Sequence, residues 1–266
     1  MNKHLKLSNG ERIALALILM FAAGLAGFQT GIKWTERVVR RVTYVDPTDG
    51  DELAKLVEAY GPTRNSQNAE EWIVRDFFRD QPAGVFVDVG ANDHQRFSNT
   101  YYLETVLGWS GVAIEPQVKF ADGYKRHRPK TTFVPLFVSD VSNQQATLYV
   151  TANDLVASSS REFTEAYGSV TPTTATTTTL DDVLDRLHLA KIDFLSMDIE
   201  LAEPRALAGF SIERFRPRLV AVEAHPPIRQ QLLDYFTAHG YSLVGKYWRI
   251  DSENFWFAPR GSVKDP

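Results

Sequence analysis

The sequence contains no cysteine among its 266 residues. This absence excludes disulfide bonds, thiolate-ligated metals and cysteine nucleophiles. A strong excess of one charge is also lacking, because 29 Lys and Arg stand against 33 Asp and Glu. Nucleic-acid-binding surfaces are usually rich in positive charge, so this balance argues against a nucleic-acid partner. Small or neutral partners fit the composition better.

The N-terminal region contains one long apolar run, residues 13–32, which has no charged residue. At about 1.5 Å per residue, 20 helical residues span roughly 30 Å, the thickness of the hydrocarbon core of a bilayer. We therefore expect a tail over residues 1–12 and one transmembrane anchor over residues 13–34, with the lipid bilayer as partner. A cleaved signal peptide is the alternative, because basic residues precede the run and Gly24-Leu25-Ala26, within it, offer small residues for a peptidase. The length of the run favours the anchor.

Residues 35–64 predict a connector that contains a turn and a short helix ending at Gly61-Pro62. A second amphipathic run begins at Ala69 and leads into the folded domain, which is expected over residues 65–260.

From there short apolar runs alternate with helical patterns, which is typical of βαβ units and a mostly parallel sheet. The expected principal strands are 85–89, 111–115, 132–138, 192–198 and 218–223. Segments 241–247 and 254–258 predict an antiparallel closing hairpin, after a helix near 228–239. The threonine-rich stretch 171–179 predicts a loop. Helix starts are expected at Ser98-Asn99, Thr179-Leu180 and Glu203-Pro204.

Polar residues follow these strands at the edge where open α/β sheets bind ligands. Gly90 permits a tight turn after the first strand, and Glu115 stands 25 residues later, near the spacing of a ribose-binding carboxylate. No second glycine follows Gly90 to hold a pyrophosphate, so an adenosyl cofactor without phosphate fits better, and S-adenosylmethionine is the obvious one. The candidate cofactor-binding residues are Asp88, Gly90, Ala91, Asn92, Asp93, Glu115 and Asp140.

Six segments carry a family resemblance: VFVDVGANDH, SNTYYLE, GWSGVAIEP, TTTLDDVL, IDFLSMDIELAE and VAVEAH. In this order they resemble successive blocks of FkbM-type methyltransferases, over roughly residues 66–258. The resemblance implies an α/β class I methyltransferase fold, Rossmann-like, with S-adenosylmethionine held by Asp88–Asp93 and Glu115. Members commonly methylate hydroxyl groups of sugars or other secondary metabolites, so a small-molecule or glycan acceptor is expected.

The sequence departs from the family where His94 and Leu201 replace usual glycines, and a side chain at either position could narrow the pocket. Two hypotheses follow. One is an active O-methyltransferase at the membrane, and the other is a membrane-tethered binding protein that keeps the fold without catalysis. The retained acidic and turn residues favour the enzyme.

The candidate catalytic residues are Asp198, Glu200 and His225. Glu223 and His225 alternate along an extended segment, so both side chains should point to one face. The ordinary pKa of histidine, near 6.5, suits a base that deprotonates a hydroxyl, and Asp198 is the competing base. Asp198, Glu200 and His225 could also hold a hard cation, but their spacing matches no recognised metal motif, so no metal is expected.

The charges that flank the apolar run do not decide the orientation of the anchor. Because S-adenosylmethionine is made in the cytosol, we expect a single-pass membrane protein with its catalytic domain on the cytoplasmic side.

Overall fold

The computed structural model describes residues 49–152 and 156–262. The predicted tail and anchor lie outside these residues. Within the described part of the chain, no helix is both long enough and apolar enough to cross a membrane. Helix α2 (Asp49–Tyr60), in the predicted connector, packs on α3 (Glu70–Phe78) and belongs to the compact unit Asp49–Pro266.

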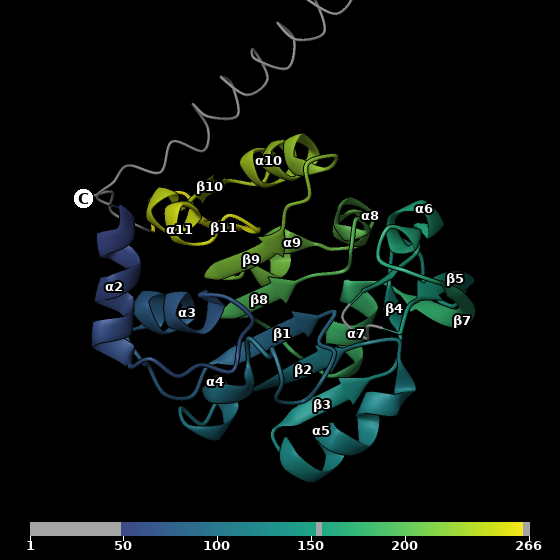
Figure 1. Ribbon diagram of the computed structural model, residues 1–266, viewed down its shortest axis with the longest axis horizontal. Helices are drawn as coiled ribbons and strands as arrows, with labels where there is room; N and C mark the ends of the chain where they lie inside the picture. Colours follow the sequence, from purple (N-terminus) through teal and green to yellow (C-terminus); the bar gives the residue numbers. More distant parts are fainter. Residues whose placement is uncertain (1–48, 153–155, 263–266) are drawn as a thin grey trace, which may run out of the picture. The chain divides into compact units, whose positions relative to one another are not determined.

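The described residues form a main sheet in the order β10-β11-β9-β8-β1-β2-β3 (Figure 1). Adjacent strands from β9 to β3 are parallel, and β11 is antiparallel to both β9 and β10. The chain order reverses between β1 and β8, which is the switch point where such sheets bind ligands. The expected parallel sheet with an antiparallel closing pair is confirmed. The strands are β1 (Val85–Val89), β2 (Ser110–Ile114), β3 (Thr131–Val134), β8 (Phe194–Met197), β9 (Leu219–Glu223), β10 (Tyr241–Leu243) and β11 (Asn254–Pro259).

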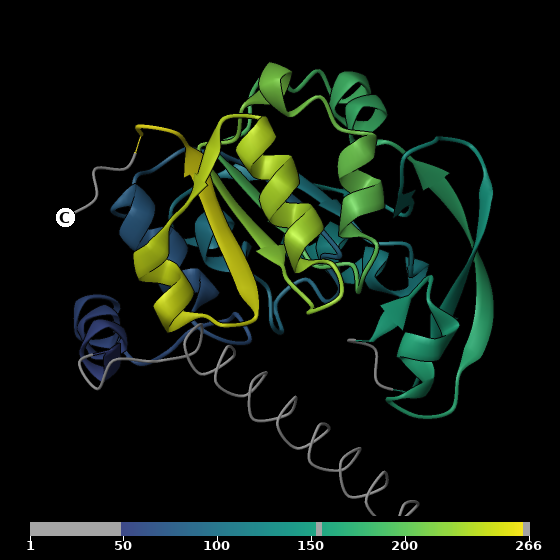
Figure 2. The ribbon, with the colours of Figure 1, turned by 90° about the horizontal axis from the view of Figure 1, so that it is seen from above.

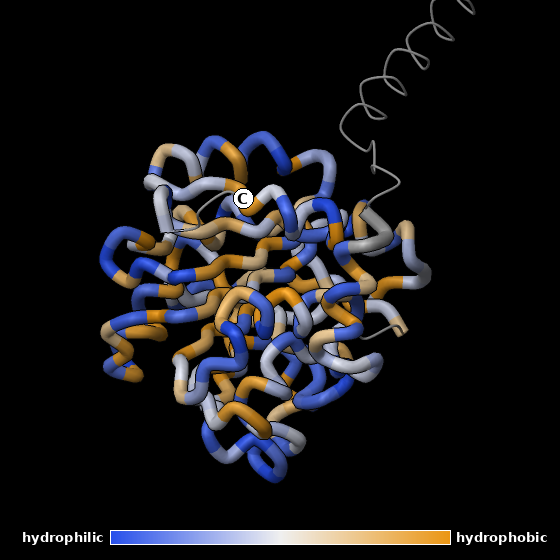
Figure 3. The backbone as a smooth tube through the Cα atoms, turned by 90° about the vertical axis from the view of Figure 1, so that its left-hand side faces the viewer, coloured by the Kyte–Doolittle hydropathy of each residue, from blue (hydrophilic) through white to orange (hydrophobic). Residues whose placement is uncertain are grey.

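Successive strand residues face opposite sides of the sheet. Their side chains pack into two main hydrophobic cores, one on each face. Val87 and Leu195 belong to the core covered by α7 (Leu180–Arg186), α8 (Glu203–Ala208), α9 (Ile212–Phe215) and α10 (Arg229–Ala238). Figure 2 shows α10 and α8 side by side on this face. Phe86 and Phe194 belong to the other core, with α2, α3, α4 (Tyr101–Thr105) and α11 (Gly245–Ile250). The apolar segments concentrate in the centre of the fold in Figure 3.

The third expected strand, 132–138, is wrong as a single element, because it divides into β3 and β4 (Phe137–Val138), which belong to different sheets. Pro135 stands at the break, and proline has no amide hydrogen with which to continue a ladder. Beside β3 lie the 3₁₀ turn η1 (Val118–Phe120) and α5 (Ala121–His127).

The predicted loop 171–179 is also wrong, because β7 (Thr171–Thr178) is the longest strand of a second sheet in the order β4-β7-β5-β6. Threonine is β-branched and suits an extended backbone. The remaining members are β5 (Gln145–Val150) and β6 (Ala157–Ser158), followed by α6 (Arg161–Glu165). In Figure 1 this sheet lies on the side to which the arrowheads of β8 and β1 point.

The helix starts are confirmed in part. The Thr179 side chain accepts a hydrogen bond from the amide of Asp182 at 3.1 Å and caps α7, and Glu203 begins α8. The start expected at Ser98-Asn99 is wrong, because α4 begins after Thr100 without a side-chain cap. The expected strand 241–247 ends at Leu243, and its remaining residues enter α11.

Candidate active site

A cavity of about 560 Å³ opens at the carboxyl ends of β1, β2, β8 and β9. Its volume lies in the range of about 300–1,000 Å³ that small-molecule sites occupy. Most of the predicted site residues line this cavity: Asp88, Gly90, Ala91, Asn92, Glu115, Asp198, Glu200 and His225. Asp93 and Asp140, also predicted to bind the cofactor, do not line it.

The turn after β1 depends on Gly90, whose φ is +81°. A Cβ atom added to Gly90 would lie 1.7 Å from the carbonyl oxygen of Asp198, so the turn presses directly against the end of β8. The amide of Gly90 donates to the carbonyl of Ile114 at 2.9 Å, which ties the turn to β2 as well. The predicted tight turn is therefore present, and it brings backbone from three strands together at one edge of the cavity.

Glu115 lies beneath this turn and is only 4% exposed. Its carboxylate accepts hydrogen bonds from the amides of Asn92 at 3.3 Å and Gln117 at 2.8 Å. Burial raises the pKa of Glu115, and the hydrogen bonds from the two amides oppose that rise. A carboxylate has about four acceptor sites, so Glu115 can still accept hydrogen bonds from a ligand in the cavity.

Asp88 is buried at the end of β1, where it accepts a hydrogen bond from the hydroxyl of Thr100 at 2.8 Å. Burial raises the pKa of Asp88 to about 6. Asp93 lies outside the cavity, and its carboxylate accepts hydrogen bonds from the amides of Gln95 and Arg96. Asp93 therefore shapes the loop rather than the cavity wall.

Arg128 holds the loop that contains Asp93, and the sequence analysis did not predict this role. Its guanidinium is buried, pairs with Glu104 at 2.6 Å, and donates to the carbonyls of His94 at 2.8 Å and Thr100 at 3.1 Å. A buried arginine with several acceptors fixes the path of the chain that it binds. The loop that follows the turn at Gly90 is therefore held by a side chain from the C-terminal end of α5.

Asp140, which follows β4, forms an ion pair with Arg205 at 2.8 Å and accepts a hydrogen bond from Ser139. These contacts join the second sheet to α8. The structure therefore does not bring Asp140 to the predicted cofactor site.

The two departures from the family pattern lie away from the cavity wall. His94 stacks on His127 at a ring separation of 4.8 Å, against α5. Leu201 packs against the core and has φ +77°, a conformation that glycine adopts without strain. Neither side chain lines the cavity, so neither narrows the pocket as the sequence comparison with the family suggested it could.

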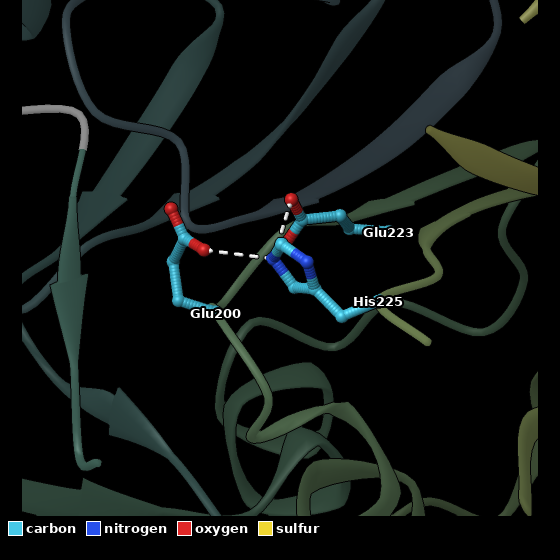
Figure 4. Close-up of side chains that lie close together, drawn as sticks. All are labelled: Glu200, Glu223 and His225. Carbon is cyan, nitrogen blue, oxygen red and sulfur yellow. Dashed lines mark hydrogen bonds and ion pairs between the residues drawn. The ribbon is translucent and has the colours of Figure 1, made fainter. Parts of the chain in front are cut away.

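Three side chains meet on the other side of the cavity (Figure 4). Nε2 of His225 lies 3.0 Å from Oε2 of Glu200 and 2.9 Å from Oε1 of Glu223. The contact of His225 with Glu223 confirms that both point to one face. Hydrogen bonds to Glu200 and then Glu223 raise the pKa of His225 to about 10, so its imidazole is protonated at neutral pH.

Asp198 follows β8 and lies deep in the cavity, with its carboxylate exposed to the cavity space. Its amide donates to the carbonyl of Val89 at 2.9 Å, which places it beside the turn at Gly90. Loss of contact with bulk water inside the cavity raises the pKa of Asp198, although the residue is accessible from the cavity, and the charges of Glu223 and Glu200 raise it further.

Several wall residues were not predicted. Asn99 lines the cavity and donates to the hydroxyl of Ser196, in β8, at 3.0 Å. The second sheet contributes apolar wall residues that include Phe137, Leu148 and Ala157. Phe137 lies within the expected strand 132–138, whereas Leu148 and Ala157 lie in strands that the sequence did not predict.

The family described as Methyltransferase FkbM domain matches residues 88–243. Comparison with curated proteins finds no match. Among solved structures, precorrin-6y C5,15-methyltransferase from Geobacter metallireducens GS-15 is similar with 12% identity and a TM-score of 0.42, covering 72% of this chain and 87% of that chain. A TehB-like SAM-dependent methyltransferase from Corynebacterium glutamicum ATCC 13032 Kitasato has 12% identity and a TM-score of 0.43, covering 77% of this chain and 94% of that chain.

Proposed function

Because the chain belongs to the FkbM methyltransferase family, we propose that it methylates a hydroxyl group with S-adenosylmethionine as methyl donor. The observation that carries the proposal is the turn at Gly90, which presses on the end of β8 and opens on the same cavity as Glu115 and Asp198. The cofactor supplies a methyl group on a positively charged sulfur. The acceptor class, a sugar, glycan or other secondary metabolite, follows from the family and remains part of the proposal.

The residues at the Gly90 turn and Glu115, on one side of the cavity, fit an adenosyl group. The turn Gly90–Asn92 offers backbone to an approaching ligand, and Glu115 offers carboxylate oxygens to ribose hydroxyls. Only one glycine stands in the turn, so it lacks the glycine pattern with which dinucleotide folds hold a pyrophosphate. We therefore assign this side of the cavity to S-adenosylmethionine.

Calorimetric titration of the purified full chain with S-adenosylmethionine tests this assignment. Glu115→Gln should weaken binding by roughly 10- to 150-fold, because a hydrogen bond to a charged group contributes about 1.5–3 kcal/mol. Glu58→Gln, at an exposed position of α2, is the matched control and should leave affinity unchanged. Absence of binding by the unaltered chain would instead support the rival hypothesis of a binding protein without catalysis.

We assign proton transfer to Asp198. Nε2 of His225 is occupied by two carboxylates, whereas Asp198 contacts Glu223 alone among these groups and is exposed to the cavity beside the turn at Gly90. When the acceptor oxygen gains the methyl group, its proton passes to the Asp198 carboxylate, and His225 holds Glu200 and Glu223 in place.

Formation of S-adenosylhomocysteine with a panel of hydroxyl-bearing acceptors measures the consequence. Asp198→Asn should lower turnover by roughly 10²- to 10⁴-fold while cofactor affinity stays within about threefold. His225→Gln should change chiefly the KM for the acceptor. If His225→Gln abolished turnover and Asp198→Asn did not, the two roles would have to be exchanged.

We further propose that residues 13–34 anchor the enzyme in a membrane, with the catalytic domain on the cytoplasmic side. The support is the uncharged run in the sequence and the cytosolic source of the cofactor. Such an anchor would favour acceptors that are themselves held at the membrane.

A further inference from the structure

The group formed by Glu200, Glu223 and His225 offers one ligand atom from each side chain, and these atoms all lie within 4.8 Å of one another. Glu200 follows β8, whereas Glu223 ends β9 and His225 follows it, so the sheet itself fixes their convergence. Figure 4 shows the two carboxylates on either side of the imidazole. All three line the cavity and are only partly exposed.

This corner of the cavity gathers more carboxyl groups than one imidazole can pair with. Asp198 and Glu203 both act electrostatically on Glu223, so four carboxyl groups lie near one another and only Glu200 and Glu223 contact His225. Nε2 of the imidazole carries at most one proton, yet it faces an oxygen of each of two carboxylates. The imidazole can therefore donate a proton from Nε2 to only one of these two oxygens at a time, and the other oxygen is open to a second positive partner.

Two buried oxygens support the same conclusion. Oε2 of Glu223 and Oε2 of Glu203 are buried and accept no hydrogen bond from the described residues. Glu203 is wholly buried, while its other oxygen accepts the amide of Ile199 at 2.9 Å. Unsatisfied buried carboxylate oxygens are costly, and a divalent cation beside them would offset much of that cost.

We infer that Glu200, Glu223 and His225 bind a divalent cation of the Mn²⁺ and Mg²⁺ class, which takes the place of the proton on Nε2 of His225 when it binds. Carboxylate oxygens favour hard cations, and Mn²⁺ also accepts an imidazole nitrogen. The sequence predicted no metal because it considered Asp198, Glu200 and His225, whose spacing matches no motif. In the structure Glu223 takes the place of Asp198 beside Glu200 and His225. Three protein ligands on a cavity wall leave coordination positions open to water or to an acceptor oxygen.

The bound ion would position an acceptor hydroxyl near Asp198, and this role rests on the proposed function. Binding of the ion itself does not depend on the proposed function. The purified full chain, stripped with a chelator and dialysed, is titrated with MnCl₂, and free Mn²⁺ is followed by electron paramagnetic resonance. We expect one saturable Mn²⁺ per chain. Glu223→Gln and His225→Gln should each weaken its binding at least about tenfold, as loss of a direct ligand requires.

Asp185→Asn is the matched control, because it removes one carboxylate that pairs with Arg214 outside the cavity. Its Mn²⁺ affinity should equal that of the unaltered chain. Thermal unfolding checks that each variant is folded, and Glu200→Gln, on the turn after β8, replaces any variant that is not.

The inference is overturned if the chain shows no saturable Mn²⁺ site, or if binding survives the loss of each ligand. Calorimetry with S-adenosylmethionine on the same metal-free sample keeps the two proposals apart. Retained cofactor binding without a Mn²⁺ site would remove the ion alone, whereas a Mn²⁺ site without cofactor binding would remove the methyltransferase assignment alone.

Discussion

The structure makes two separate demands on the residue type at Gly90. Its φ of +81° favours glycine over any residue with a side chain, and the space where a Cβ would lie is already occupied by the carbonyl of Asp198. The sequence could predict the first demand, because a lone glycine after an apolar strand indicates a tight turn. The second could not be predicted, because it depends on how closely β8 approaches β1.

Gly61 provides a comparison that separates the two demands. Its φ is +85°, and no atom lies within 4 Å of an added Cβ. Gly61→Ala should lower the free energy of unfolding by about 1–2 kcal/mol, the cost of left-handed backbone for a residue with a side chain. Gly90→Ala should cost clearly more and should also abolish binding of S-adenosylmethionine. Urea unfolding measures the first effect and calorimetry the second. Equal losses in the two variants would show that the turn can move away from β8.

The cavity residues at strand ends could be predicted from the sequence. The residues that hold the neighbouring loops in place could not. Asp88, Glu115 and Asp198 each follow or end an apolar run, and all three reach the cavity. Arg128 gave no such signal, because its importance comes from acceptors on a loop about thirty residues earlier in the chain. Asp140 is the converse case: it was among the predicted cofactor residues, but its carboxylate pairs with Arg205 outside the cavity.

Among the elements, buried strands were predictable because both of their faces are apolar. β8 and the first four residues of β9 are fully buried, and their runs stand out in the sequence. β7 is different, since its first four residues are exposed and only its second half approaches the core. Hydrophobic periodicity fails for such a strand, and only the β-branched character of threonine indicated its conformation. The second sheet, and with it one wall of the cavity, was therefore missed.

At the scale of the whole molecule, the proposed anchor over residues 13–34 would divide the sequence into a membrane segment and a catalytic unit. The full chain should remain in the membrane fraction after an alkaline carbonate wash, whereas a chain without residues 1–41 should be released. N-terminal sequencing of the mature protein is the control. A mature protein beginning near Gly27 would establish a signal peptide, because the apolar run would then have been removed.

Two buried carboxylates connect the first helices to the closing strands. Glu70 of α3 and Asp251 before β11 are both buried, and the side chain of Asn254 contacts both of them, at 3.5 Å and 3.0 Å respectively. Burial, and then the charge of Asp251, raises the pKa of Glu70 to about 7. The group is therefore more easily protonated in the folded chain than in the unfolded chain, where carboxyl pKa values are near 4.3.

This difference sets the direction of a pH effect on the stability of the catalytic unit. Between the unfolded and folded pKa values the folded chain binds more protons, so the free energy of unfolding falls as pH rises. From about pH 6 to about pH 8.5, Glu70 should account for a loss on the order of 1 kcal/mol. Glu70→Gln should remove that part of the loss, whereas Glu58→Gln, exposed on α2, should keep it. Urea unfolding at the two pH values measures both. An identical pH dependence in Glu70→Gln and the unaltered chain would mean that Glu70 remains ionised in the fold, with Asn68 and Asn254 stabilising its charge.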